Sequence, residues 1–130
     1  MINYTTQSKW KIGNFIRELL MGNEELKGMI GENIYPIVAP EGIKGEFLVY
    51  NRGKYTKLKS NMGIYQEECI VYVLAVSDNY DSSVKMAELI DATLTGEHIY
   101  NNNRIIIDLD DSSESFQELK YVQSLSFRIR

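Results

Sequence analysis

The chain has 130 residues, of which 44% are hydrophobic and 25% charged, and its formal net charge is −4 at pH 7. This length suits one domain with a single hydrophobic core, and the composition is that of a folded protein, which excludes wholesale disorder. The acidic balance argues against a general nucleic-acid binder, whose surface would carry an excess of basic residues.

The single cysteine, Cys69, excludes an intrachain disulfide and a zinc site built on several thiolates. Its place in an apolar stretch predicts a small core residue. No apolar run approaches the roughly 20 residues that span a membrane, and residues 1–7 lack the pattern of a secretory signal. We therefore expect one domain over residues 1–130, with residues 1–7 flexible, that works in the cytoplasm without a membrane partner.

The first regular segment is helical. Apolar residues recur at spacings of three and four between Ile12 and Leu20, with Ser8 as a candidate N-cap and Gly22 as the stop. A short helical turn is expected over residues 24–30, where glycines limit its length.

Strand patterns follow. Residues 34–38 are apolar but contain Pro36, which has no N–H, so they can form only an edge strand or an extended connector. A strand is expected at residues 46–51, followed by a polar loop from residue 52 to 63. Residues 65–77 predict a long strand whose second half is apolar on both sides, as in the centre of a sheet.

The second half of the chain again predicts a helix followed by strands. A helix is expected from one of three candidate N-caps to Leu94, with Gly96 after it. Those caps are Asp81, Ser82 and Ser83. A turn at 101–103 precedes a strand at 104–109, and the alternation at 124–130 predicts a half-buried last strand. This order predicts an α+β fold: a mixed, mostly antiparallel sheet of four to five strands with two helices packed on one face.

No catalytic signature emerges from the chain. Asp108 and Asp110 are the best candidates for a metal site, because clustered carboxylates bind hard cations, but Ser113 and Leu119 stand where an EF-hand has Gly and Glu. A solvated strand end and loop is the favoured interpretation. The only histidine, His98, is expected at the surface, and the glycines form no nucleotide-binding motif. We expect no enzyme activity, metal or cofactor.

Two segments of opposite charge are candidate protein interfaces. The basic loop contributes Arg52, Lys54, Tyr55, Lys57 and Lys59, and the acidic segment contributes Asp108, Asp110, Asp111 and Glu114. Neither segment contains a residue of the opposite charge. Such segments meet acidic or basic protein surfaces more often than a phosphate backbone, so no specific nucleic-acid binding is expected.

The pattern Ile34-Tyr35-Pro36-x-x-Ala39-Pro40-x-Gly42, followed by an apolar strand that ends in Tyr50, resembles the tail-completion (tail-terminator) family of tailed bacteriophages. The order of the other elements is also similar: a leading helix, a strand at 70–76 that runs into a helix, and a closing strand at 123–130. The resemblance covers about residues 10–130.

The resemblance implies a non-enzymatic structural protein of a phage or prophage virion, assembled in the cytoplasm of the bacterial host. Such proteins form a ring, commonly of six subunits, that caps the tail tube and joins it to the head connector, and they can be monomers in isolation. The implied partners are tail-tube and head-connector proteins and further copies of the chain. A small adaptor domain with no part in virion assembly is the alternative.

A head-to-tail ring contact needs two different, complementary surfaces on each subunit. The basic loop and the acidic segment are the candidates for these two surfaces. An enzyme with a metal centre at Asp108 and Asp110 is the remaining interpretation.

Overall fold

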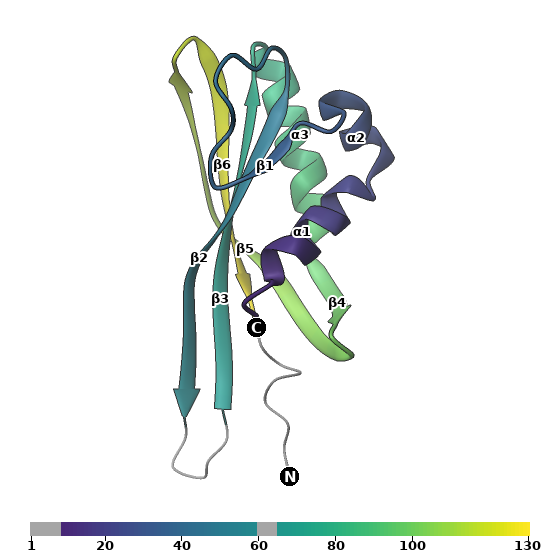
Figure 1. Ribbon diagram of the computed structural model, residues 1–130, viewed down its shortest axis with the longest axis vertical. Helices are drawn as coiled ribbons and strands as arrows, with labels where there is room; N and C mark the ends of the chain where they lie inside the picture. The colour runs from purple at the N-terminus through teal and green to yellow at the C-terminus, as the bar shows by residue number, and fades with distance from the viewer. Residues whose placement is uncertain (1–8, 60–64) are drawn as a thin grey trace.

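The computed structural model describes residues 9–59 and 65–130, which form three helices beside one face of a twisted, six-stranded sheet (Figure 1). The helices are α1 (Ile12–Met21), α2 (Glu24–Ile30) and α3 (Tyr80–Leu94). The strands are β1 (Ile34–Pro36), β2 (Phe47–Lys59), β3 (Tyr65–Ser77), β4 (Gly96–Tyr100), β5 (Asn103–Gln117) and β6 (Lys120–Ile129). No helix in the described part is long and apolar enough to cross a membrane.

The strand order in the sheet is β1-β2-β3-β6-β5-β4. The β1–β2 pair is parallel and the other pairs are antiparallel. The predicted α+β class and mixed sheet are therefore confirmed, but the described residues form six strands rather than four to five and three helices rather than two. The strand that sequence reasoning missed is β4, whose five residues directly follow α3 and are too few to show a clear alternation.

Both charged segments are strands, whereas the basic one was expected to be a loop and the acidic one a strand end followed by a loop. β2 continues through residue 59 and pairs with β3, and β5 continues through residue 117 and pairs with β6. Each is the polar half of a long hairpin, held extended by its neighbour rather than by its own propensity. Polar residues on both faces hid these strands, because sequence patterns detect only strands with a buried face.

The core lies between the helices and the sheet face that they cover. Cys69, Val71, Val73 and Phe127 project from the two central strands into this core and are fully buried. Opposite them lie buried residues of the helices, namely Ile12, Ile16, Leu20, Met86, Ile90 and Leu94. The buried position of Cys69 confirms its prediction as a core residue.

The helix ends differ in detail from the expected ones. The N-cap of α3 is Asn79, which lies two to four residues before the three expected caps. Its side chain accepts a hydrogen bond from the N–H of Ser82. α2, expected as a short turn, is a full element capped in the same way by Asn23. Lys11 holds the N-cap position of α1 without a side-chain bond, and Ser8 lies outside the described residues.

Two hairpin turns use residues with positive φ. Asn101 and Asn102 join β4 to β5 with φ of 51° and 62°, and Glu118 and Leu119 join β5 to β6 with φ of 51° and 65°. Positive φ at both central residues is characteristic of a type I′ turn, whose twist matches that of the two strands in a hairpin. The expected turn at 101–103 is thus confirmed, with Asn103 already in β5.

Phe127→Ala should lower the free energy of unfolding by about 3–5 kcal/mol, because the ring is fully buried between the sheet and the helices. Chemical denaturation monitored by circular dichroism measures this loss. Phe116→Ala is the matched control, since Phe116 is 56% exposed and should lose less than about 1.5 kcal/mol. Equal losses would contradict the assignment of Phe127 to the core.

Candidate functional site

The lower part of the β2–β3 hairpin forms an arm, whose inner residues Cys69 and Val71 belong to the core and whose outer part extends beyond it. This arm, residues 51–59 of β2 with residues 65–72 of β3, extends past the helices in Figure 1. Of the predicted basic interface residues, all five lie on its β2 strand. The side chain of Lys59 is outside what the structure describes.

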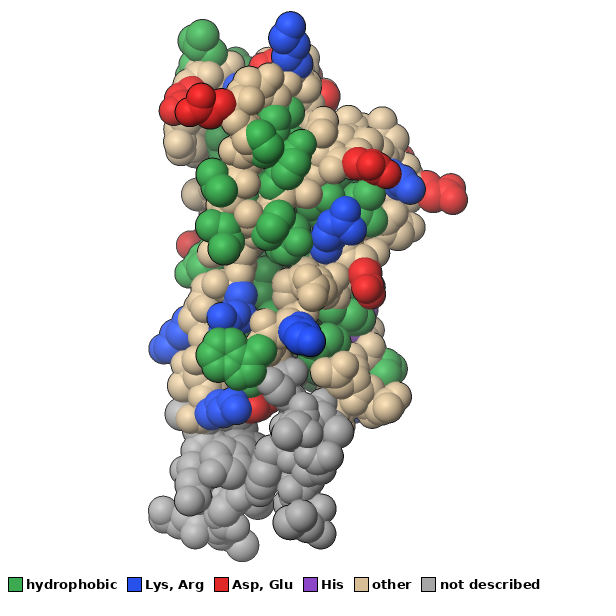
Figure 2. Space-filling view, viewed as in Figure 1, with side chains coloured by type: hydrophobic (Ala, Val, Ile, Leu, Met, Phe, Trp, Pro, Cys, Tyr) green, Lys and Arg blue, Asp and Glu red, His purple; other side chains and the backbone are tan. Residues whose placement is uncertain are grey.

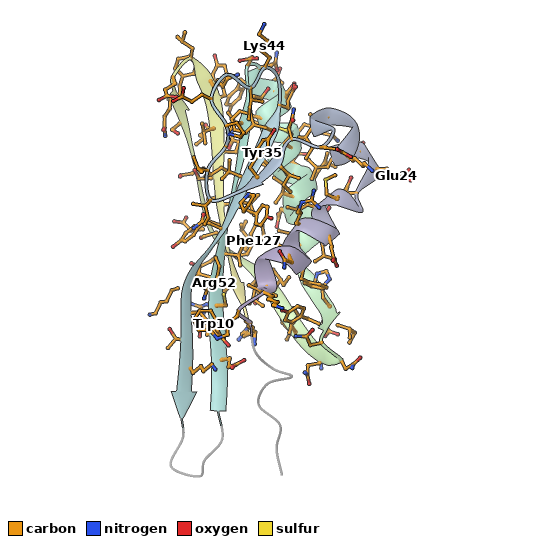
Figure 3. All side chains as sticks on the ribbon, viewed as in Figure 1. Trp10, Glu24, Tyr35, Lys44, Arg52 and Phe127 are labelled. Carbon is orange, nitrogen blue, oxygen red and sulfur yellow. The ribbon has the colours of Figure 1, made fainter. Side chains whose placement is uncertain are left out.

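A tryptophan marks the base of the arm. Trp10, just before α1, is 63% exposed, and the guanidinium carbon of Arg52 lies 4.5 Å from the centre of its ring. The Tyr55 ring meets the Trp10 ring edge-on at 5.3 Å between centroids. Figure 3 shows Trp10 and Arg52 next to each other, and Figure 2 shows basic side chains gathered around this part of the surface. Arg52 is half-buried, and tryptophan and arginine are enriched at protein interfaces.

Trp10 was missed by sequence reasoning, although a signal was present. It lies outside the apolar stripe of α1, whose buried residues are Ile12, Ile16 and Leu20. A large aromatic residue beside a helix, but not on its buried face, is a candidate for an exposed contact.

A buried carboxylate ties the arm to the start of α1. Glu67 of β3 forms ion pairs with Lys9 at 3.6 Å and with Lys57 at 3.7 Å, and its Oε1 accepts a hydrogen bond from the Tyr55 hydroxyl at 3.0 Å. The side chains of Glu67 and Lys9 are only 5% and 7% exposed. Tyr55 and Lys57, predicted as interface residues, are therefore engaged inside the chain, whereas Lys54 is exposed and forms no ion pair with a described residue.

The acidic segment lies on β5, and its first two carboxylates form ion pairs with arginines in and directly after β6. Asp108 pairs with Arg130 at 3.2 Å, and Asp110 pairs with Arg128 at 3.8 Å. Arg128 also pairs with Glu68 at 3.2 Å. In the described ranges, no three His, Cys, Asp or Glu residues are arranged to hold a metal ion. The two candidate metal ligands, Asp108 and Asp110, therefore each form an ion pair with an arginine.

The two remaining carboxylates of the segment have no cationic partner among the described residues. Glu114 accepts hydrogen bonds from Gln123 Nε2 at 2.9 Å and from the Tyr80 hydroxyl at 3.0 Å. These bonds lower the pKa of Glu114, and the same contact raises the pKa of Tyr80. Asp111 accepts a hydrogen bond only from the neighbouring N–H of Ser112 among the contacts described.

The structure does not bring the basic and acidic segments together within one chain. β3 and β6 lie between β2 and β5 in the sheet. The two segments are therefore separate surfaces of opposite charge on one molecule.

A groove of about 590 Å³ lies on the sheet face that the helices leave open. Its wall is the loop between β1 and β2, and its floor is apolar, with Phe47, Val49, Leu74, Val76 and Val122.

Pro36 ends the edge strand β1, which confirms its expected place at a sheet edge. Ile37 then adopts φ of 67°, a conformation that costs a branched residue about 1–2 kcal/mol.

The single histidine and the single cysteine both have structural roles, the first in a hydrogen bond and the second in the core. His98 lies half-buried on β4, where Nε2 donates to the carbonyl of Leu94 at 2.8 Å at the end of α3. This partial exposure agrees with the expected position of His98 at the surface. Burial raises the pKa of Cys69 to about 11, which keeps the thiol protonated at neutral pH.

Comparison of structures finds a similar protein, whereas comparison of sequences finds none. No protein family and no curated protein matches its sequence. Among solved structures, a chain from the "Virion of native gene transfer agent (GTA) particle" has the same fold, with a TM-score of 0.72 and 16% sequence identity. The match covers 88% of this chain and 90% of that chain.

Lys9→Met should lower the free energy of unfolding by about 2–3 kcal/mol, because it removes the buried cation from a buried carboxylate. The remaining partner, Lys57, is partly exposed and compensates only in part. Thermal or chemical denaturation measures the loss.

Two further variants control this prediction. Lys85→Met breaks an exposed pair with Glu25 and should cost less than about 1 kcal/mol. Lys9→Met combined with Glu67→Met should recover most of the loss, since no buried charge remains. A single Lys9→Met loss no larger than that of Lys85→Met would refute the role of the buried pair.

Cys69 should not react with a thiol reagent such as 5,5′-dithiobis(2-nitrobenzoic acid) at pH 8 in the folded protein, since it is buried and its pKa is about 11. One equivalent of thiol should react after unfolding in guanidinium. Rapid reaction of the native protein would contradict the buried position.

Proposed function

We propose that this protein is a structural component of a phage-like virion and that it acts there as a tail-completion protein. In this role it caps the tail tube as a ring and joins the tube to the head connector. Its partners are tail-tube proteins, connector proteins and further copies of itself, and it reaches the virion from the cytoplasm of a bacterial host.

The observation that carries this proposal is the shared fold with a chain of a gene transfer agent virion, over nearly the full length of both chains. The sequence resemblance to the tail-completion family, centred on the Pro36 and Pro40 pattern, supports the more specific role at the tail end.

Two features of the structure agree with a role in assembly. The exposed Trp10 ring and the half-buried Arg52 side chain lie at the base of the arm, and two charged segments of opposite sign lie on separate strands. A ring subunit requires such a pair of different surfaces. The groups that could serve catalysis have structural partners instead: His98 contacts a helix end, and Asp108 and Asp110 contact arginines. The proposed role is accordingly non-catalytic.

The test uses tail tubes purified from particles that lack this protein. Electron microscopy of the tubes mixed with the purified protein should show extra density at one end of each tube, in the form of a ring. Tubes that already carry a completed end serve as the control and should gain none. Binding at neither end, or along the whole length of the tube, would overturn the role as a tail-completion protein, and a monomer indifferent to tails would favour the adaptor domain.

A further inference from the structure

Two strands of the sheet have long open edges. β1 pairs with β2 only at residues 48–50, and β4 pairs with β5 only at residues 103–107. On these outer sides, residues 51–59 of β2 and residues 108–117 of β5 have no strand partner among the described residues. An open edge presents unpaired backbone N–H and C=O groups, which form a template for pairing with another strand.

From these edges, and resting on the ring function proposed above, we propose that copies of this chain join edge to edge. The open edge of β2 in one copy pairs with the open edge of β5 in the next, so that the two sheets become continuous. Main-chain hydrogen bonds supply the contact, and side-chain charges select the partner.

The charges of the two edges are complementary. The β2 edge contains four basic residues and no acidic one, and the β5 edge contains four acidic residues and no basic one. Two copies of the same edge would repel each other, since like charges on facing strands are destabilising. Pairing of β2 with β5 is therefore favoured over pairing of an edge with itself.

The complementarity extends to both faces of the sheet. Lys54 lines the open face with Thr56 and Glu68, and Asp111 lies on the same open face, opposite Ser126 and near Tyr72. On the face that the helices cover, Glu114 contacts Tyr80 of α3. Arg52 of the opposite edge reaches Trp10 on that same face. A continuous sheet would thus place Lys54 beside Asp111 on one face and Arg52 beside Glu114 on the other.

Each edge is expected to bind a second copy of this chain, because the chain itself carries an edge of the opposite charge. Each copy offers one β2 edge and one β5 edge, so the contact is head-to-tail. Such a contact closes into a ring when the rotation between neighbours closes, which is the assembly the proposed function requires.

A charge swap tests the pairing. Lys54→Glu alone and Asp111→Lys alone should each weaken self-association roughly tenfold, because one attraction becomes a repulsion. The double variant carries the reversed charge on both edges and should recover association close to the unchanged protein. Sedimentation at low ionic strength measures it, and a matched control, Lys85→Glu on the exposed side of α3, should have no effect.

Disulfide trapping tests the geometry directly. Thr56→Cys in one preparation is mixed with Asp108→Cys or Asp110→Cys in another, because antiparallel pairing of Lys54 with Asp111 brings Thr56 opposite this part of β5. The mixture is oxidised mildly, both alone and on capped tails. Neighbouring strands place facing Cβ atoms about 4.5–5.5 Å apart, so at least one mixture should give a cross-linked dimer of two different chains. Thr56→Cys mixed with Lys85→Cys is the control, and the buried Cys69 does not interfere.

The outcomes separate this inference from the proposed function. Tails capped by the protein without any cross-link above the control would overturn the edge contact and leave the capping role intact. Cross-links and charge-swap recovery in a protein that ignores tails would support the edge contact and overturn the capping role. A double variant as weak as the single ones would also overturn the edge contact.

Discussion

The pairing of β3 with β6 is the interaction on which the rest of the structure depends. It runs without a register shift from Cys69 opposite Ile129 to Ser77 opposite Tyr121. The residues of this pair that face the helices, such as Val71 and Phe127, are fully buried. α1 and α3 can pack only where this apolar surface exists, so the central pair sets the position of the whole helical layer.

The same pairing joins two hairpins that carry opposite charge. β3 brings β2 with its basic residues, and β6 brings β5 with its acidic residues. Because the two central strands lie between them, the charged strands are held on opposite sides of the sheet centre. Exposed charges contribute little to the stability of a monomer, so their segregation agrees with the contact between copies proposed above.

Not every charge in these segments is available for such a contact. Lys57 is paired with Glu67, Asp110 with Arg128 of β6, and Asp108 with Arg130, which directly follows β6. Lys54, Asp111 and Glu114 form no ion pair with a described residue, and they lie on the open parts of the two edges. Among the predicted interface residues whose side chains the structure describes, some are therefore engaged within the chain, and Lys54, Asp111 and Glu114 stay candidates for contact with a partner.

The sequence by itself determined the elements with a buried face. The apolar spacing of α1, the doubly apolar second half of β3 and the alternation of β6 are direct consequences of burial. The bounds of α1 and β3 were predicted closely, whereas β6 begins four residues before the predicted start at 124. The mixed α+β class followed from their order. The two charged segments were likewise recognisable as separate, opposite surfaces from composition alone.

Only the tertiary structure decided what those segments are. β4 and the polar halves of β2 and β5 have no continuous buried face, so their extended form comes from hydrogen bonds to a neighbouring strand and leaves no periodic trace in the sequence. The same holds for the contact of Trp10 with Arg52 and for the burial of Lys9 with Glu67, which join residues far apart in the chain. Periodicity records which residues face the core, whereas pairing between distant segments decides which edges remain open.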